Sequence, residues 1–299
     1  MLNCAVLAAV VTVWFWERSV GRGGLKLSVR SVLVVAAACL LTGAGPAGLG
    51  SNPIVKEVQN TEEYFPDEIG SVWWYAGRTR TETIERIADE AFTNEVSAIG
   101  TTNIKGETAK IFRETNQGNK GPTDGFFRRD KTGITYYGSQ PTTPFEQQLV
   151  PYRVLIFPLV MEGSFRQLEK KGVDMQVDLD GDGHPERADV VADVRVVGYT
   201  PVTVAAGSFT NALQIDASMT ITVTLTKDRR VVVSKDTITS WFARGVGLVK
   251  YVEEIEAPPV LETRAEVTYV SEELESYTLK GKVGVPAAPV PPQTHGGRL

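Results

Sequence analysis

The chain has 299 residues, of which 42% are apolar and 22% are charged, and its formal net charge is −5. This composition excludes a wholly disordered chain, and the acidic balance without a basic stripe argues against nucleic acid as a partner. The two cysteines, Cys4 and Cys39, both lie near the N-terminus, so the folded part has no disulfide, thiolate nucleophile or zinc-thiolate site.

Residues 1–45 are typical of an export signal with an additional apolar region. Lys26 and Arg30 precede an apolar run of about a dozen residues, the charged-then-apolar order of a secretory signal. The earlier apolar stretch, residues 2–16, is either a second membrane segment or the product of a start codon assigned too far upstream, and we favour the second. Cys39 follows three alanines and is a candidate lipidation site, whereas ordinary cleavage within residues 42–50 is the rival. We therefore expect an exported protein, in the periplasm or anchored to the outer membrane as a lipoprotein, with membrane contact only through such an anchor.

After this region, alternating apolar and polar residues predict a mainly β domain over residues 64–282, preceded by a tether over 46–63. We expect a hairpin from residues 126–129 and 134–137 and long strands over 190–199, 217–226 and 229–241, with residues 227–229 as a tight turn. A closing strand is expected over 265–279. The best helical window is 82–92, although a polar strand with a bulge fits it nearly as well. Residues 283–299, rich in Pro and Gly, predict a disordered tail.

Four stretches resemble a group of uncharacterised bacterial lipoproteins and secreted proteins related to the Lol-type lipoprotein-carrier half-barrels. They begin with Tyr64-Phe65-Pro66 and residues 70–75, and continue with Pro158-Leu159 and residues 163–165, residues 204–213, and residues 241–250. The resemblance implies a curved antiparallel sheet around an apolar groove, with one or two short helices and no known catalytic residue. The long acidic loop departs from the carriers and puts lipid-carrier activity in question.

Glycines and aromatic residues in these stretches have a physical interpretation without the family. Gly207 is expected to supply a turn before the next strand, and Gly245 and Gly247 to let a strand kink where the sheet curves. The aromatic residues would either line a concave groove or simply pack in the core. They are Trp73, Trp74, Tyr75, Trp241 and Phe242.

Residues 178–189 carry the pattern D-x-D-x-D-G with acids at the ninth and twelfth positions, a spacing that converges hard oxygen ligands on calcium. The expected ligands are Asp178, Asp180, Asp182 and Glu186, with Asp189 last and His184 offering its backbone carbonyl. Strands are expected on both sides, unlike the helices of an EF-hand. The alternative is a solvated acidic hairpin held by Asx turns.

The sequence contains few of the residues that catalytic sites need. The two histidines are His184 in the acidic loop and His295 in the tail, so a Ser-His-Asp triad is excluded and no enzyme is expected. The acids at 253, 254, 256 and 262 are interpreted as a solvated strand face rather than a catalytic pair.

Two functions stay open. One is an envelope module that binds an apolar or lipid-like ligand in a half-barrel groove, with a calcium-ordered hairpin. The other is a structural or protein-interaction module of the envelope without a small-molecule ligand. The sequence does not fix the oligomeric state.

Overall fold

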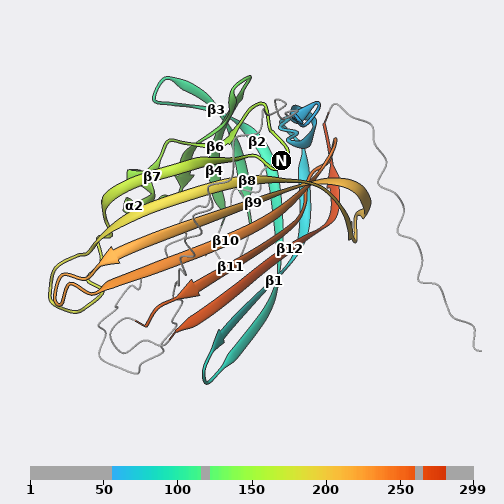
Figure 1. The fold of residues 1–299 in the computed structure, drawn as a ribbon. Helices are drawn as coiled ribbons and strands as arrows, with labels where there is room; N and C mark the ends of the chain where they lie inside the picture. The colour runs from blue at the N-terminus through green and yellow to red at the C-terminus, as the bar shows by residue number, and fades with distance from the viewer. Residues whose placement is uncertain (1–55, 116–121, 260–264, 281–299) are drawn as a thin grey trace, which may run out of the picture.

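The computed structural model describes residues 56–115, 122–259 and 265–280, and in this part the chain forms a single antiparallel sheet (Figure 1). Two short helices accompany the sheet, the 3-10 helix η1 (Thr61–Tyr64) and the α-helix α2 (Pro144–Leu149). The strands are β1 (Val72–Thr83), β2 (Ile87–Ile104), β3 (Glu107–Glu114), β4 (Thr123–Asp130), β5 (Gly133–Gln140), β6 (Tyr152–Ile156), β7 (Ser164–Asp174), β8 (Arg187–Val204), β9 (Gly207–Thr224), β10 (Val231–Ala243), β11 (Gly247–Ala257) and β12 (Glu266–Thr278).

The strand order makes the sheet a nearly closed barrel. It runs β6-β5-β4-β3-β2-β1-β12-β11-β10-β9-β8-β7, so two meanders are joined where the first strand pairs with the last. The two edges of the sheet, β6 and β7, come from strands that follow each other in the chain, and they approach each other. The expected antiparallel β class is therefore confirmed, and the sheet curves further round than a half-barrel.

Two glutamine side chains hydrogen-bond to the edge strands, one joining α2 to β7 and the other joining β7 to β6. Gln148 at the end of α2 donates its amide to the Asp174 carbonyl at 2.9 Å and accepts from the Asp174 N–H at 3.0 Å, as a neighbouring strand would. Gln167 on β7 donates to the Val154 carbonyl on β6 at 3.3 Å. Because an unpaired strand edge exposes backbone donors and acceptors, these amides protect both edges of the sheet.

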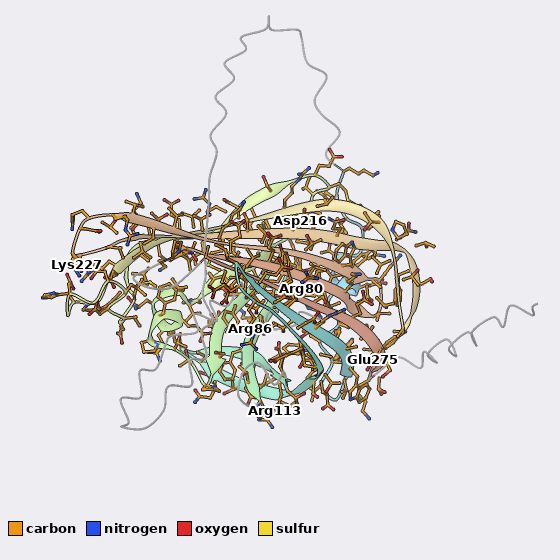
Figure 2. The ribbon with its side chains drawn as sticks, turned by 90° about the horizontal axis from the view of Figure 1, so that it is seen from below. Arg80, Arg86, Arg113, Asp216, Lys227 and Glu275 are labelled. Carbon is orange, nitrogen blue, oxygen red and sulfur yellow. The ribbon has the colours of Figure 1, made fainter. Side chains whose placement is uncertain are left out.

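The inner wall of the barrel follows from the period-two pattern. Alternate residues of β9 from Leu213 to Val223 are buried, and each faces an inward residue of β10 in the antiparallel register. Burying this many aliphatic side chains supplies the main stabilising term. The barrel is flattened, since β8 also contacts β11 and β12 across the interior. The long β9–β10 hairpin extends to one end of the barrel. Figure 2 shows Lys227 at the tip of this hairpin and Glu275 near the opposite end of the barrel.

Residues 56–67 close one end of the barrel. Val58 N–H donates to the Leu159 carbonyl at 2.8 Å, and Phe65 is buried against Phe242, with ring centroids 5.0 Å apart. We expected residues 46–63 to be a tether; residues 56–63 of that range are packed on the barrel. Local polarity concealed this packing, because Val58 and Thr61 are buried between exposed polar neighbours.

The expected hairpins are confirmed, although β9 begins at Gly207, well before the expected start at residue 217. Asp130 and Gly133 form the closing pair of β4 and β5, and Thr132 N–H donates to the Asp130 side chain at 2.7 Å. Gly133 has φ 144°, a backbone conformation that glycine adopts freely. The turn after β9 is also present, with Leu225 N–H donating to the Arg230 carbonyl at 2.9 Å. Gly207, with φ 141°, opens β9 as expected.

Two local predictions need correction. Of the two alternatives for residues 82–92, the strand is found and the helix is not: this segment is the tip of the β1–β2 hairpin, where Ile84 is 87% exposed and Ile87 is 60% exposed. The isoleucines of this segment have no core to pack against, and the backbone groups are hydrogen-bonded in the β1–β2 pairing instead of in a helix. Gly245 and Gly247 do not lie inside a strand as expected; with φ 74° and 102°, Gly245 is in the turn between β10 and β11 and Gly247 opens β11 opposite Ala243.

Residues 1–45 with Cys39, and the tail 283–299, lie outside the described residues. Within the described ranges no helix has the length and apolar character needed to cross a membrane.

Candidate metal centre

The acidic loop connects β7 to β8 at one end of the barrel. β7 ends at Asp174 and β8 begins at Arg187, so the residues between them form the connection. Met175 N–H donates to the Glu186 carbonyl at 2.9 Å, and Glu186 N–H donates to the Val177 carbonyl at 3.1 Å. These two bonds narrow the base of the loop and bring its first and last acids together.

Three acidic side chains of the loop converge. Asp178, Asp180 and Glu186 each offer one carboxylate oxygen, and these oxygens lie within 4.8 Å of one another. Asp178 is exposed, whereas Asp180 and Glu186 are buried. Calcium prefers about six to eight oxygen ligands, and carboxylates are its usual protein ligands. The three side chains could supply part of such a shell.

Glu186 has an unsatisfied oxygen at this point. Its side chain is fully buried, and its Oε2 accepts the Leu179 N–H at 2.6 Å, while Oε1 has no hydrogen-bond donor. Burial raises the pKa of Glu186, and the negative charges of Asp180 and Asp178 raise it further. A buried carboxylate without a donor or cation is costly, so this oxygen is where a cation would stabilise the loop most.

Backbone amides hold Asp178 in place. Its Oδ1 accepts from Gly181 N–H at 2.6 Å, and its Oδ2 accepts from Gly183 N–H at 2.8 Å. These are the Asx-turn contacts that the solvated-hairpin alternative predicts. They orient the Asp178 side chain, but they supply no hydrogen-bond donor to Glu186 Oε1.

The loop is also fastened to the turn after β9. Asp180 Oδ2 accepts the Lys227 N–H at 2.9 Å, and Asp182 Oδ2 accepts the Thr226 hydroxyl at 2.8 Å. The Thr226 hydroxyl and the His184 N–H hold the pKa of Asp182 below its ordinary value. An ion bound in this loop would therefore affect both the β7–β8 connection and the turn between β9 and β10.

The structure separates the expected ligands into two groups. Asp178, Asp180 and Glu186 come together, but Asp182 is turned towards Thr226 and His184. The His184 side chain is exposed beside Asp182, with Nδ1 3.3 Å from Oδ1. Asp189 lies on β8 and accepts the Gly172 N–H at 2.8 Å. Sequence spacing could not reveal this division, because it depends on partners in β7 and in the turn after β9.

The five aromatic residues proposed for a groove lie on opposite faces of the sheet. Trp73, Tyr75 and Phe242 are fully buried, as the core alternative expected. The Trp73 indole donates to the Val246 carbonyl at 2.7 Å, and the Tyr75 hydroxyl donates to the Leu248 carbonyl at 3.1 Å. Trp74 and Trp241 alternate to the outer face and are half-buried, where Trp74 donates to Glu95 at 2.9 Å.

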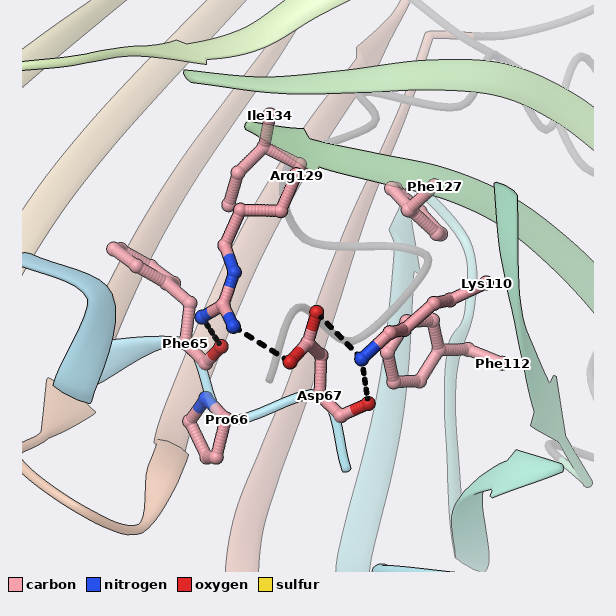
Figure 3. Close-up of a pocket in the computed structure, with 8 residues that line it drawn as sticks. All are labelled: Phe65, Pro66, Asp67, Lys110, Phe112, Phe127, Arg129 and Ile134. Carbon is pink, nitrogen blue, oxygen red and sulfur yellow. Dashed lines mark hydrogen bonds and ion pairs between the residues drawn. The ribbon is translucent and has the colours of Figure 1, made fainter. Parts of the chain in front are cut away.

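One hollow near this core lies under residues 65–67 (Figure 3). It has a volume of about 20 Å³, far below the roughly 300 Å³ of a small ligand site. Asp67 spans its edge through ion pairs with Lys110 at 3.0 Å and Arg129 at 2.7 Å. Arg129 also donates to the Phe65 carbonyl at 2.7 Å. These contacts fasten the N-terminal segment over the barrel end and leave room for little more than water.

A second hollow of about 560 Å³ lies outside that segment. It is open to solvent and bordered by residues 57–62, 129–131 and 157–158. Charged and polar residues dominate this border, which does not match an apolar groove.

No protein-family model and no curated protein sequence matches the chain. Among solved structures, a protein from Bacteroides fragilis named as exported, with a YmcC-like fold, is 11% identical with a TM-score of 0.32, and the match covers 72% of this chain and 98% of that one. A protein named as a lipoprotein from Parabacteroides distasonis is 9% identical with a TM-score of 0.31 and the same two coverages. A DUF1329-family protein from Desulfovibrio piger is 7% identical with a TM-score of 0.22, covering 73% and 89%. These scores are low, so the description of the fold rests on this chain's own strand pairings, and the relation to Lol-type carriers stays a prediction.

Proposed function

We propose that this chain is an exported, non-catalytic envelope protein of the structural or interaction type, whose β7–β8 loop binds calcium. The observation that carries the calcium site is the buried Glu186 carboxylate, which has one oxygen without a hydrogen-bond partner and converges with Asp178 and Asp180. The export part of the proposal is supported by the charged-then-apolar order of residues 25–44.

Calcium is the cation that this set of groups favours. The converging atoms are carboxylate oxygens, without the thiolate or imidazole donors that favour zinc. Calcium sites of extracellular modules bind at about 0.1–1 mM, which suits a shell built from few side chains.

The role supported here is structural. Calcium would neutralise the three carboxylates, and Asp180 would pass that effect to the turn after β9 through Lys227 N–H. An ion that binds only the folded state stabilises it by mass action, by about 1.4 kcal/mol at ten times the dissociation constant.

An apolar or lipid-like ligand in a groove has weaker support. The inward aromatic residues are packed in the core, the hollow beside them is about 20 Å³, and the larger hollow is polar. The structural or interaction alternative is therefore favoured, and its partner in the envelope is left open.

The test is a thermal melt of the full chain with calcium at about 10 mM, ten times the upper end of the expected dissociation constants, or with a chelator. At ten times the dissociation constant we expect a rise in melting temperature of roughly 3–6 °C. Glu186→Gln keeps the side-chain volume and the oxygen that accepts Leu179 N–H, but removes the charge, and should abolish the rise.

Asp189→Asn is the matched control, because Asp189 belongs to the sequence pattern but lies outside the three-carboxylate group. It should keep the full calcium response. A wild-type chain that melts at the same temperature with calcium and with chelator would overturn the site, and an equal response in Glu186→Gln would place the ion elsewhere.

A further inference from the structure

A second acidic pair lies inside the barrel, formed by Asp236 on β10 and Glu253 on β11. Asp236 shares its face of β10 with the buried residues Ser234, Ile238 and Ser240. Glu253 is two residues from the buried Tyr251, on the same face of β11. Both acids are half-buried, and the inward position of Glu253 differs from the solvated strand face expected from the sequence.

Apolar side chains surround the pair in the strand register. Asp236 lies opposite Met219 on β9 and Ile255 on β11. Glu253 lies opposite Ile238 on β10 and Val270 on β12. The inward residues of β8, across the barrel, are alanines and valines.

Asp236 and Glu253 are diagonal neighbours on the inward face of the β10–β11 pair, so their carboxyl groups lie within reach of each other. Asp236 Oδ1 is buried and has no hydrogen-bond partner. A hydrogen bond between two carboxyl groups needs a proton, because two carboxylates offer only acceptors. A proton held between the two groups would provide such a bond.

The other ionisable groups of the interior are acids and tyrosines. Tyr251 lies two residues from Glu253 on β11, and its hydroxyl is buried without a hydrogen-bond partner. Glu272 on β12 lies opposite Tyr251 and accepts from Asn94 on β2 at 3.1 Å. Further acids and a tyrosine face inward from β12, β3 and β1, namely Glu266, Glu114 and Tyr75.

Burial and electrostatics agree with this geometry. Burial raises the pKa of Asp236 well above its ordinary range, and the charge of Glu253 raises it further. Burial also raises the pKa of Glu253, against the lowering influence of the neighbouring Tyr251 and Asp236.

We propose that the proton held between Asp236 and Glu253 closes the β10–β11 seam of the barrel, which makes the seam sensitive to pH. Loss of that proton to solvent leaves two carboxylates in contact inside an apolar wall. The repulsion loosens the pairing of β10 with β11, while the pairing of β8 with β9, whose facing side chains are aliphatic, is unaffected.

The sign of the pH dependence follows from linkage. Both acids have raised pKa values in the folded state, so the stability they contribute is full below the unfolded value of about 4 and is lost as pH rises through the folded values. The wild-type chain should thus become less stable between mildly acidic and mildly basic pH.

The experiment compares melting temperatures of the full chain at pH 5.5 and pH 8 in the presence of a chelator. Asp236→Asn and Glu253→Gln should each reduce the wild-type fall by roughly 3 °C or more. Glu254→Gln is the matched control, since Glu254 is the next residue of β11 and faces outward opposite Tyr269. It should keep the wild-type fall.

Hydrogen exchange of the wild-type chain gives a second measurement that needs no variant. After correction for the intrinsic effect of pH on exchange, β10 and β11 amides should lose protection at pH 8 while β8 and β9 amides keep theirs. Equal protection at both pH values would overturn the proposal. So would a wild-type fall in melting temperature that persists in both interior variants, and if neither variant folds, the exchange result decides.

Discussion

The β7–β8 loop and the β10–β11 seam both bring carboxyl groups together, yet their surroundings give them opposite needs. In the loop, backbone amides point at the acids, solvent is near, and Glu186 keeps one oxygen free beside Asp178 and Asp180. In the seam, aliphatic residues lie directly opposite Asp236 and Glu253 on the paired strands, and the two acids are diagonal neighbours. The first arrangement is suited to a cation and the second to a proton. Residue type alone does not decide between them.

The largest expected effect tests whether the barrel interior is packed. Trp73→Ala should lower the free energy of unfolding by about 3–5 kcal/mol, because it removes a fully buried side chain and its hydrogen bond to Val246. Trp74→Ala, on the outer face of the same strand, should cost clearly less. Urea denaturation checks both, and a near-neutral Trp73→Ala would mean that the interior is an open groove.

The second prediction ranks the loop acids. Asp178→Asn should weaken calcium binding at least about tenfold, whereas Asp182→Asn should act less, since its side chain is held by Thr226 and His184. Titration with calcium, followed by the melting temperature at each concentration, measures both constants. Equal losses would favour the ligand set expected from sequence spacing.

The third prediction concerns the seam at fixed pH. Glu253→Gln should raise the free energy of unfolding at pH 8, by an amount on the order of 1 kcal/mol, because it removes a charge that burial disfavours. At pH 4.5 the gain should shrink or vanish. Urea denaturation at both values gives the answer, and a gain independent of pH would point to packing instead of charge.

The smallest effect is expected for an acid that is paired on the surface. Asp89 forms a two-point contact with Arg78 at 2.6 Å, and this partner lowers the pKa of Asp89. Because the pair is solvated, Asp89→Asn should change the melting temperature little, and salt should reduce that change further. A large loss would show that surface ion pairs matter more here than the interior acids.

Local patterns predicted the parts of the fold that local chemistry determines. Alternation predicted β9 and β10, and the Asp130–Gly133 segment predicted its hairpin turn. The same kind of pattern failed at residues 82–92, where a helical spacing of isoleucines lies on a solvent-exposed hairpin tip. The β1–β12 pairing depends on contacts far apart in sequence, and the approach of β6 to β7 depends on how far the whole sheet curves, so no local pattern predicts either.

The candidate sites divide in the same way. Spacing within residues 178–189 was enough to propose a calcium loop, because its acids are close in sequence. It could not separate Asp189 from Asp178, since the distinction depends on Gly172 in β7. The seam acids were missed because Glu253 stands in a run of acids and its partner is on another strand. Its position two residues from Tyr251, on the inward face, is the signal that could have identified it.

Calorimetric titration of the full chain with calcium, at neutral pH, tests the central claim most directly. The wild-type chain should bind one ion with a dissociation constant of about 0.1–1 mM, and Glu186→Gln should show no binding in that range. Absence of binding to the wild-type chain, or undiminished binding to Glu186→Gln, would contradict the assignment of the β7–β8 loop as the calcium site.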